Sequence, residues 1–304
     1  MSSMIDCLQL TKTYGSNTAL NRVNFSVDNG DPIALVGPNG SGKTTLFSLM
    51  CGYIRPTSGI IQLFGHQPGS PALFGRVSAL PQDAQLDPRF AIGHQLKFYA
   101  QLQGMSTKQA QLDCERVLDL VELKHSIKDK PNTLSHGMRK RITIAQALLG
   151  SPELVLLDEP TAGLDPVNAR NIRQLIAQNN MKTTFMISSH NLNELEKLCG
   201  TVLHLNLGLM GKTEAISSDP QQGFITLHME SSSADLKVFL SDIPGIHKVS
   251  QLSRNEYLIS YDPAESPDLD IKILKMLDEN QLNYRQLIKG KSLEEQLFSS
   301  ETPN

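Results

Sequence analysis

The stretch "IALVGPNGSGKTT", residues 33–45, decides the fold of this chain. It begins with apolar residues typical of a buried strand, and the "LFSLMCGYI" that follows predicts a helix. Between them the glycines at positions 37, 40 and 42 permit a tight loop whose backbone N–H groups point at one spot. A strand, such a loop and a helix in this order indicate a parallel α/β sheet with an anion site at a strand end.

The loop also has the spacing G-x-x-x-x-G-K-[ST] of a phosphate loop. In this pattern Lys43 reaches the β- and γ-phosphates of a nucleotide, and the hydroxyl of Thr44 binds Mg²⁺. A plain glycine-rich turn is the alternative, which the strand before the loop and the helix after it disfavour. The residues expected to bind phosphate are Gly37, Pro38, Asn39, Gly40, Ser41, Gly42, Lys43, Thr44 and Thr45.

Two further predicted strands end in polar residues. "LVLLDEP" (154–160) is an apolar run that ends in Asp158 and Glu159, and "TTFMISSH" (183–190) ends in His190. Chemistry gathers at the carboxyl ends of parallel strands. We therefore expect Asp158 to hold the Mg²⁺ shell, Glu159 to polarise an attacking water and His190 to bond the γ-phosphate. The plainer alternatives are an acid pair at a helix N-terminus and a structural histidine.

A second anion site is predicted in "TLSHGMRKR", residues 133–141. Apolar residues recur at helical spacing from Met138 to Leu149, so this segment opens an amphipathic helix. The start of a helix, with unpaired N–H groups beside Ser135, attracts anions. The phosphate loop already supplies one site, so the phosphate that this second site binds is an open question. The basic "RKR" is interpreted as a solvated helix face.

The remaining segments predict further elements around these motifs. "VNFSV" (23–27), the turn "DNGD" and "PIALVG" predict a hairpin that leads into a buried strand. Residues 83–150 are mainly helical and more polar, like an inserted helical lobe. After residue 214 the pattern becomes β-α-β-β-α-β, followed by a last helix in "SLEEQLF". We therefore expect two domains, 1–214 and a small α+β domain at 215–304.

Composition narrows the classes of function. The 304 residues suffice for a domain of about 200 residues and a smaller one. A net charge of −3 gives no basic excess for nucleic-acid binding. Four widely spaced cysteines fit a reduced cytosolic compartment better than a disulfide or zinc framework. No run approaches the ~18 apolar residues of a transmembrane helix, so we expect membrane-spanning partners to be separate chains.

Together, these motifs resemble the ATP-binding subunit of an ATP-binding cassette (ABC) transporter, over residues 4–214 and in the family's order. By this resemblance the phosphate loop is the Walker A loop, and "LSHGM" is the signature motif. Asp158 and Glu159 are similar to the Walker B aspartate and the catalytic glutamate. Gln82, in "LPQD", resembles the glutamine of the Q-loop, which senses Mg²⁺ and water. Three more matches are Tyr14 with the aromatic that stacks on adenine, Asp165 in "GLDP" with the D-loop, and His190 with the switch histidine.

Some of these matches keep a simpler explanation or depart from the family. Tyr14 also fits a packed aromatic, and Asp165 followed by proline also fits a helix N-cap. The commonest signature is LSGGQ, whereas here His136 replaces a glycine and Met138 replaces the glutamine. The form L-S-x-G-M before basic residues resembles the cassettes of bacterial exporters.

The resemblance answers the question of the second anion site. In this family two cassettes pack head to tail, so Ser135 and the N–H of Gly137 contact a γ-phosphate that Lys43 of another cassette holds. The resemblance implies a P-loop NTPase fold with an antiparallel β subdomain, a helical subdomain and Mg-ATP hydrolysis. It further implies a homodimer or heterodimer, separate permease subunits, a place at the cytoplasmic face of the membrane, and export as the expected direction.

Three alternatives are weighed against this interpretation. A cytosolic ABC ATPase that works on DNA or ribosomes is disfavoured, because the chain has one cassette and only a short insertion after Gln82. A catalytically weak regulatory subunit is disfavoured by the intact Lys43, Glu159 and His190. A GTPase is disfavoured because no N-K-x-D base-binding motif occurs in the sequence.

Overall fold

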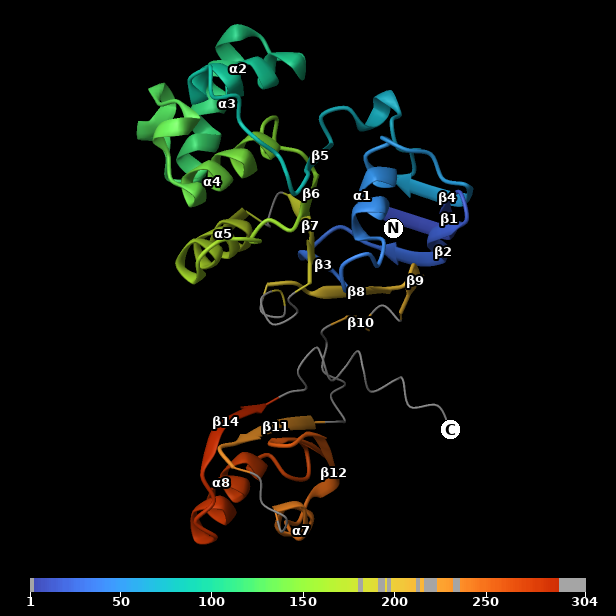
Figure 1. Ribbon diagram of the computed structural model, residues 1–304, viewed down its shortest axis with the longest axis vertical. Coiled ribbons are helices and arrows are strands. Elements are labelled where there is room, and N and C mark those ends of the chain that lie inside the picture. The colour runs from blue at the N-terminus through green and yellow to red at the C-terminus, as the bar shows by residue number, and fades with distance from the viewer. Residues whose placement is uncertain are drawn as a thin grey trace. The chain divides into compact units, whose positions relative to one another are not determined.

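The computed structural model describes residues 3–179, 183–190, 195, 198–211, 214–215, 223–231 and 236–289. The chain divides into two compact units, Met1–Ala215 and Ile216–Asn304. The first unit holds an antiparallel sheet, a mainly parallel sheet and a group of helices (Figure 1). The division falls next to the boundary predicted after residue 214.

The first sheet is antiparallel, with the strand order β2-β1-β4. Its first two strands are joined by a tight turn in which Gly15 has a φ of 58°, a conformation that favours glycine. Buried apolar residues of β2 face the core, and polar residues between them are exposed. The strands are β1 Ile5–Tyr14, β2 Asn17–Val27 and β4 Ser58–Leu63.

The second sheet carries the predicted motifs at its strand ends. Its order is β10-β8-β3-β7-β6-β5, and β9 pairs with β8. The five strands from β8 to β5 run parallel, while β10 is antiparallel to β8. Every residue of β3, β6 and β7 is buried, as expected for strands covered on both faces. The bounds are β3 Ile33–Val36, β5 Val77–Leu80, β6 Leu154–Asp158, β7 Thr184–Ser189, β8 Thr201–Asn206, β9 Leu209–Met210 and β10 Glu214–Ala215.

The hairpin predicted between residues 23–27 and 32–37 is wrong. β2 pairs with β1, whereas β3 lies in the other sheet between β7 and β8. The turn after Val27 therefore passes the chain from one sheet to the other. β3 is buried along its whole length, as is typical of a strand in a parallel sheet covered on both faces, whereas β2 alternates buried and exposed residues, as is typical of an antiparallel sheet with one solvated face.

Helix α1, Lys43–Met50, connects the two sheets through a common core. Its buried residues Leu46, Phe47, Leu49 and Met50 belong to one apolar cluster with residues of both sheets, such as Leu10 and Leu35. This packing fixes the loop that precedes α1 at the carboxyl end of β3.

The helical region contains α2 Ile92–Leu102, α3 Thr107–Leu120 and α4 His136–Ala147, which lie together in Figure 1. Ser106 and Gln109 form a capping box that starts α3. Two short 3₁₀ turns lie between α3 and α4, another precedes β5, and α5 follows β6. These remaining segments are η1 Pro71–Leu73, η2 Lys124–Lys128, η3 Pro131–Thr133 and α5 Pro166–Asn179.

The second unit has the predicted β-α-β-β-α-β order. Its sheet is antiparallel with the order β12-β13-β11-β14. It has its own core, in which Ile225, Ile259 and Ile273 are completely buried. The helix predicted in "SLEEQLF" lies outside the described residues. The elements are β11 Gly223–Met229, α7 Leu236–Ser241, β12 Ile246–Ser253, β13 Glu256–Tyr261, α8 Leu269–Glu279 and β14 Tyr284–Lys289.

Together, the two units confirm the predicted α/β fold with an antiparallel β subdomain, a helical subdomain and a small α+β part. All four cysteines are free, and burial raises the pKa of the Cys199 thiol to about 12. None of the helices within the described residues combines the length and apolar character needed to cross a membrane.

Candidate functional site

The phosphate loop lies between the end of β3 and the start of α1. Gly42 precedes α1 with a φ of 110°, and a Cβ there would come within 2.6 Å of the Ala19 carbonyl oxygen. Its backbone conformation and the close approach of β2 therefore both require glycine. A Cβ on Gly37 would overlap the carbonyl of Leu205 in β8. The glycine spacing seen in the sequence thus allows the loop to pack between β2 and β8.

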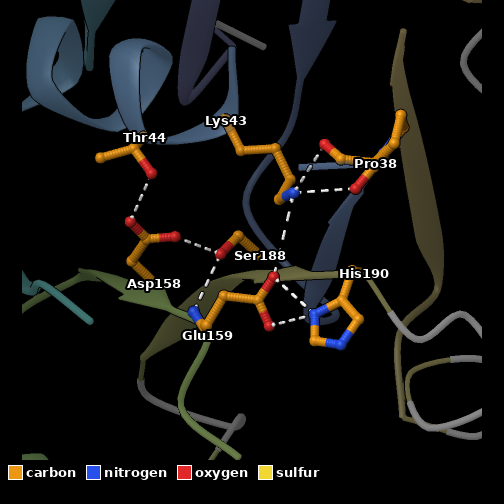
Figure 2. A network of polar contacts seen from close by, with 8 residues as sticks. Pro38, Lys43, Thr44, Asp158, Glu159, Ser188 and His190 are labelled. Carbon is orange, nitrogen blue, oxygen red and sulfur yellow. Dashed lines mark hydrogen bonds and ion pairs between the residues drawn. The ribbon is translucent and has the colours of Figure 1, made fainter. Parts of the chain in front are cut away.

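The Lys43 side chain turns back over this loop (Figure 2). Its ammonium donates to the carbonyl oxygens of Gly37, at 2.8 Å, and Pro38, at 3.2 Å. It also lies 3.9 Å from Oε1 of Glu159, and both side chains are buried. A buried ammonium is tolerated because these acceptors replace its hydration.

Asp158, at the end of β6, joins the loop to the neighbouring strand. Its Oδ2 accepts from the hydroxyl of Thr44 at 2.9 Å, and its Oδ1 accepts from the hydroxyl of Ser188 on β7. The Ser188 oxygen in turn accepts the backbone N–H of Glu159 at 2.9 Å. Ser188 therefore orients both carboxylate residues, as Figure 2 shows.

The role of Ser188 was not predicted from the sequence. Asp158 and Ser188 are direct partners in the parallel register of β6 and β7, although they are far apart along the chain. The available signal was the polar "SS" that ends an otherwise apolar strand.

Glu159 follows β6 in a left-handed conformation, with a φ of 47°. This conformation is unfavourable for a residue with a long side chain, and such strain concentrates at functional sites. The carboxylate oxygens of Glu159 lie 3.0 and 3.1 Å from Nδ1 of His190. Because an ionised carboxylate only accepts hydrogen bonds, Nδ1 carries the proton and donates it. The structure thus places His190 as a direct partner of Glu159.

A cavity of about 380 Å³ opens at these strand ends. Most of the predicted site residues line it, and those that do not are Gly37, Pro38, Ser41, Ser135, Gly137, Asp165 and His190. The β1–β2 hairpin and the β8–β9 turn also line the cavity, and no motif in the sequence indicates this. The predicted lining residues are Tyr14, Asn39, Gly40, Gly42, Lys43, Thr44, Thr45, Gln82, Asp158 and Glu159, and the additional ones are Asn17, Thr18, Ala19, Leu207 and Gly208.

Tyr14 and Gln82 reach this cavity from elements outside the phosphate loop. Tyr14 ends β1 with 48% of its surface exposed, and the Lys12 ammonium lies 5.0 Å from its ring centroid. An exposed ring at a cavity wall is available for stacking, so the packed-core alternative for Tyr14 does not hold. Gln82 follows β5 after one proline, so its position is set by the edge of the parallel sheet.

The interpretation of "RKR" as a solvated helix face is wrong. Each of these side chains is half-buried and donates to a backbone carbonyl. Lys140 donates to the carbonyl of Gln82 at 3.4 Å, and burial lowers its pKa. Arg139 and Arg141 donate to Leu134 and Val121. These three hydrogen bonds therefore anchor the start of α4 to the surrounding loops.

The other predicted anion site lies away from the cavity. Ser135 is the N-cap of α4, where its hydroxyl accepts the N–H of Met138 at 3.2 Å. Asp165 starts α5, where its Oδ1 accepts the N–H groups of Val167 and Asn168. Ser135, Gly137 and Asp165 do not line the cavity, so the structure separates them from the phosphate loop of their own chain.

The residues present fit a Mg²⁺ site of the nucleotide-dependent kind. Among the described residues, no group of three or more His, Cys, Asp or Glu side chains forms a metal cage. Mg²⁺ bound with nucleotides uses few protein ligands, because phosphate oxygens and water complete its shell. Thr44, Gln82 and Asp158 all line the same cavity and offer oxygen ligands.

A larger cavity, of about 670 Å³, lies elsewhere in the first unit. Its lining is largely apolar and includes Tyr53, Leu73 and Phe74. None of the predicted site residues lines it, so cavity size does not locate the chemistry in this chain.

Comparisons with known proteins agree with this arrangement. The family model described as "ABC transporter" matches residues 20–162. The linearmycin resistance ATP-binding protein LnrL of Bacillus subtilis (strain 168) is 33% identical over 210 residues, which cover 68% of each chain. The chain belongs to the ABC transporter family. Within this family it is also similar to the bacitracin transport ATP-binding protein BcrA of Bacillus licheniformis, with 37% identity over 202 residues.

Solved structures of ABC cassettes have the same fold as the first unit. A dimeric ATP-binding cassette, MJ0796, in a post-hydrolysis state with ADP and Pi, matches with a TM-score of 0.64 and 25% identity. The match covers 71% of this chain and 100% of that chain.

The sequence match to BcrA spans 65% of this chain and 65% of that protein, so it leaves about a third of each outside the shared region.

Proposed function

We propose that this chain is the ATP-hydrolysing motor subunit of an ABC exporter. The observation that carries the proposal is the convergence of Lys43, Asp158 and Glu159 at one cavity beside the phosphate loop. A cation, a metal-binding carboxylate and a base are the groups that phosphoryl transfer to water requires. The names of LnrL and BcrA, which describe ATP-binding proteins of resistance and transport, support the same proposal.

Each residue has a defined task in this proposal. Lys43 exchanges the carbonyls of Gly37 and Pro38 for the β- and γ-phosphate oxygens, which are stronger acceptors. Tyr14 stacks on the adenine ring at the open wall of the cavity. Thr44, Gln82 and Asp158 would hold Mg²⁺, which would supply positive charge against the charge that develops on the phosphates. The backbone N–H groups of the loop position the nucleotide for in-line attack.

Glu159 is the base of the hydrolytic step. A water attacks the γ-phosphorus, the bond from that phosphorus to the β,γ-bridging oxygen breaks, and the water's proton passes to the Glu159 carboxylate. The products are ADP and phosphate. His190 holds the Glu159 carboxylate through Nδ1–H and so fixes the orientation of the base.

The subunit works as a dimer in this proposal. Ser135 and Asp165 lie outside their own cavity, and the N-terminus of α4 is an anion site with no phosphate in its own chain. Two chains packed head to tail place this helix start over each other's γ-phosphate. Separate permease subunits at the cytoplasmic face of the membrane then convert dimer closure into export, and the second unit serves dimer contact or regulation.

Two measurements test the proposal. The purified chain should release phosphate from Mg-ATP, and gently solubilised membranes should yield it together with a membrane-spanning permease. A chain that turns over ATP but is recovered with DNA or ribosomes would instead support the cytosolic ABC ATPase. A chain that binds ATP and hydrolyses none would support the regulatory subunit.

A further inference from the structure

Gly137, in the signature motif, lies directly beneath the side chain of Asn168. A Cβ on Gly137 would overlap Cγ and Oδ1 of Asn168 and come within 2.8 Å of its Nδ2. Gly137 is buried, although its neighbours Ser135 and His136 are exposed. The first turn of α4 therefore meets the first turn of α5 through this contact.

Space, and not backbone conformation, explains glycine at this position. Gly137 belongs to α4 and is absent from the residues with positive φ. Alanine is favoured over glycine in a helix by about 1 kcal/mol, so a helical glycine needs a reason. The Asn168 amide supplies that reason within a single chain, because it occupies the volume of the missing methyl group.

The same amide is fixed by Asp165. Asp165 Oδ1 accepts the backbone N–H of Asn168 at 3.0 Å, and Oδ2 accepts the side-chain N–H of Asn168. These bonds, with one from the N–H of Val167, hold the pKa of Asp165 below its usual value. The Asn168 side chain thus contacts the D-loop residue through hydrogen bonds and the signature glycine through packing.

We propose that Asn168 is a positioning residue that fixes the start of α4 against the start of α5, so that Ser135 and Asp165 meet a second cassette as one surface. The inference rests on the head-to-tail dimer of the proposed function. It adds a reason within one chain for glycine at position 137: the Asn168 side chain occupies the space that a larger residue would need. Asn168 itself contacts no nucleotide in its own chain.

The contact is tested first without nucleotide, by a double-mutant cycle of unfolding. Gly137→Ala should raise the unfolding equilibrium constant about tenfold, the scale of an overpacked contact. In the Asn168→Ala background the same substitution should be neutral or stabilising, because the three atoms that the new methyl would meet are gone. A loss of equal size in both backgrounds would overturn the contact as the reason for the glycine.

The positioning role is tested in the Glu159→Gln chain, where slow hydrolysis preserves ATP-bound dimers. Asn168→Ala should weaken ATP-driven dimerisation about fivefold, while the single chain's affinity for ATP stays unchanged, since its cavity is untouched. Gly137→Ala should weaken dimerisation further, and the double variant should recover to the level of Asn168→Ala. Gln174→Ala is the matched control, because it truncates an exposed amide on the same helix.

The outcomes separate this inference from the proposed function. If the parent dimerises and Asn168→Ala dimerises equally well, Asn168 is only structural and the inference fails alone. If Gly137→Ala stays impaired when Asn168 is truncated, the glycine serves the neighbour's phosphate and not Asn168. If the parent itself forms no ATP-dependent dimer, the head-to-tail proposal fails, and any coupling in the unfolding cycle is then only structural.

Discussion

Lys43 Nζ lies 3.9 Å from Oε1 of Glu159, and the two side chains are 7% and 8% exposed. The cation of the phosphate loop and the carboxylate that follows β6 thus form a buried pair across the cavity. Each has further partners, the loop carbonyls for Lys43 and the His190 ring for Glu159. The pair holds both groups at the cavity where the proposed function places the γ-phosphate, and each group can be tested by a separate substitution.

Glu159→Gln should separate binding from hydrolysis. The amide keeps the size of the side chain and an oxygen that accepts from His190, so ATP affinity should change little. The base is lost, so turnover should fall by about 10²-fold or more, the scale of a positioned general base. Phosphate release and nucleotide titration measure the two quantities. Glu153→Gln is the control, because that carboxylate pairs with Arg76 outside the cavity, and normal turnover by Glu159→Gln would remove Glu159 from its role.

Lys43→Ala should act on binding itself. The substitution removes the cation that faces the β- and γ-phosphates, so the affinity for ATP should fall at least ~10-fold, as for loss of a charge-assisted bond. Truncating one partner of a buried pair also leaves the other charge poorly compensated, so stability should fall by about 1–3 kcal/mol. Lys108→Ala, on the exposed face of α3, should alter neither. Unchanged ATP affinity in Lys43→Ala would contradict the assignment of the loop.

Ser188→Ala should affect stability and turnover together. It leaves Asp158 Oδ1 and the Glu159 N–H without their buried partner, which costs about 1–3 kcal/mol in unfolding free energy. Because Glu159 loses its backbone anchor, kcat should fall more than ATP affinity. Ser48→Ala, whose hydroxyl bonds only one turn back within α1, should cost less than ~0.5 kcal/mol. Denaturation and steady-state kinetics measure the two effects. If Ser188→Ala and Ser48→Ala give the same stability and the same kcat, Ser188 does not bridge Asp158 and Glu159.

The role of Ser188 also marks a limit of the sequence. The loop, Asp158 and Glu159 were predictable, because a motif of fixed spacing between a strand and a helix determines its own geometry. The Asp158–Ser188 bond depends on which strands are neighbours and on the register in which they pair. Neither property can be predicted from the spacing of residues within a short stretch of sequence. The wrong hairpin at residues 23–37 has the same origin, since a turn signal does not specify the sheet to which the next strand belongs. The packing of Asn168 over Gly137 likewise required the arrangement of two helices.

A chain that ends at Ala215 should fold and bind ATP. The apolar core of the first unit is formed by residues from Met4 to Met210, and the second unit has a separate core. No site residue predicted from the sequence lies beyond residue 190. Thermal melting and nucleotide titration of the shortened chain test this directly. A shortened chain that is folded but binds no ATP would show that the second unit contributes to the site.

The shared site predicts complementation between two inactive variants. Lys43→Ala damages the phosphate loop of its own chain, and Ser135→Arg puts bulk and charge at the N-cap of α4, which lies outside that chain's cavity. A homodimer of either variant has two defective sites. In a mixed dimer, the phosphate loop of the Ser135→Arg chain meets the intact signature of the Lys43→Ala chain, while the other site collects both defects.

Mixing the two variants should therefore restore one intact site in each mixed dimer. The measurements are ATP trapping, ATP-dependent dimerisation and turnover, because a single intact site can close a dimer even where hydrolysis requires both. Ser135→Ala is a useful third variant, since it removes the Ser135 hydroxyl and its cap bond to Met138 without adding bulk or charge. If mixed dimers form but trap no more ATP than either variant by itself, Ser135 does not serve a neighbour's nucleotide. The anion site at the start of α4 would then need an explanation within one chain.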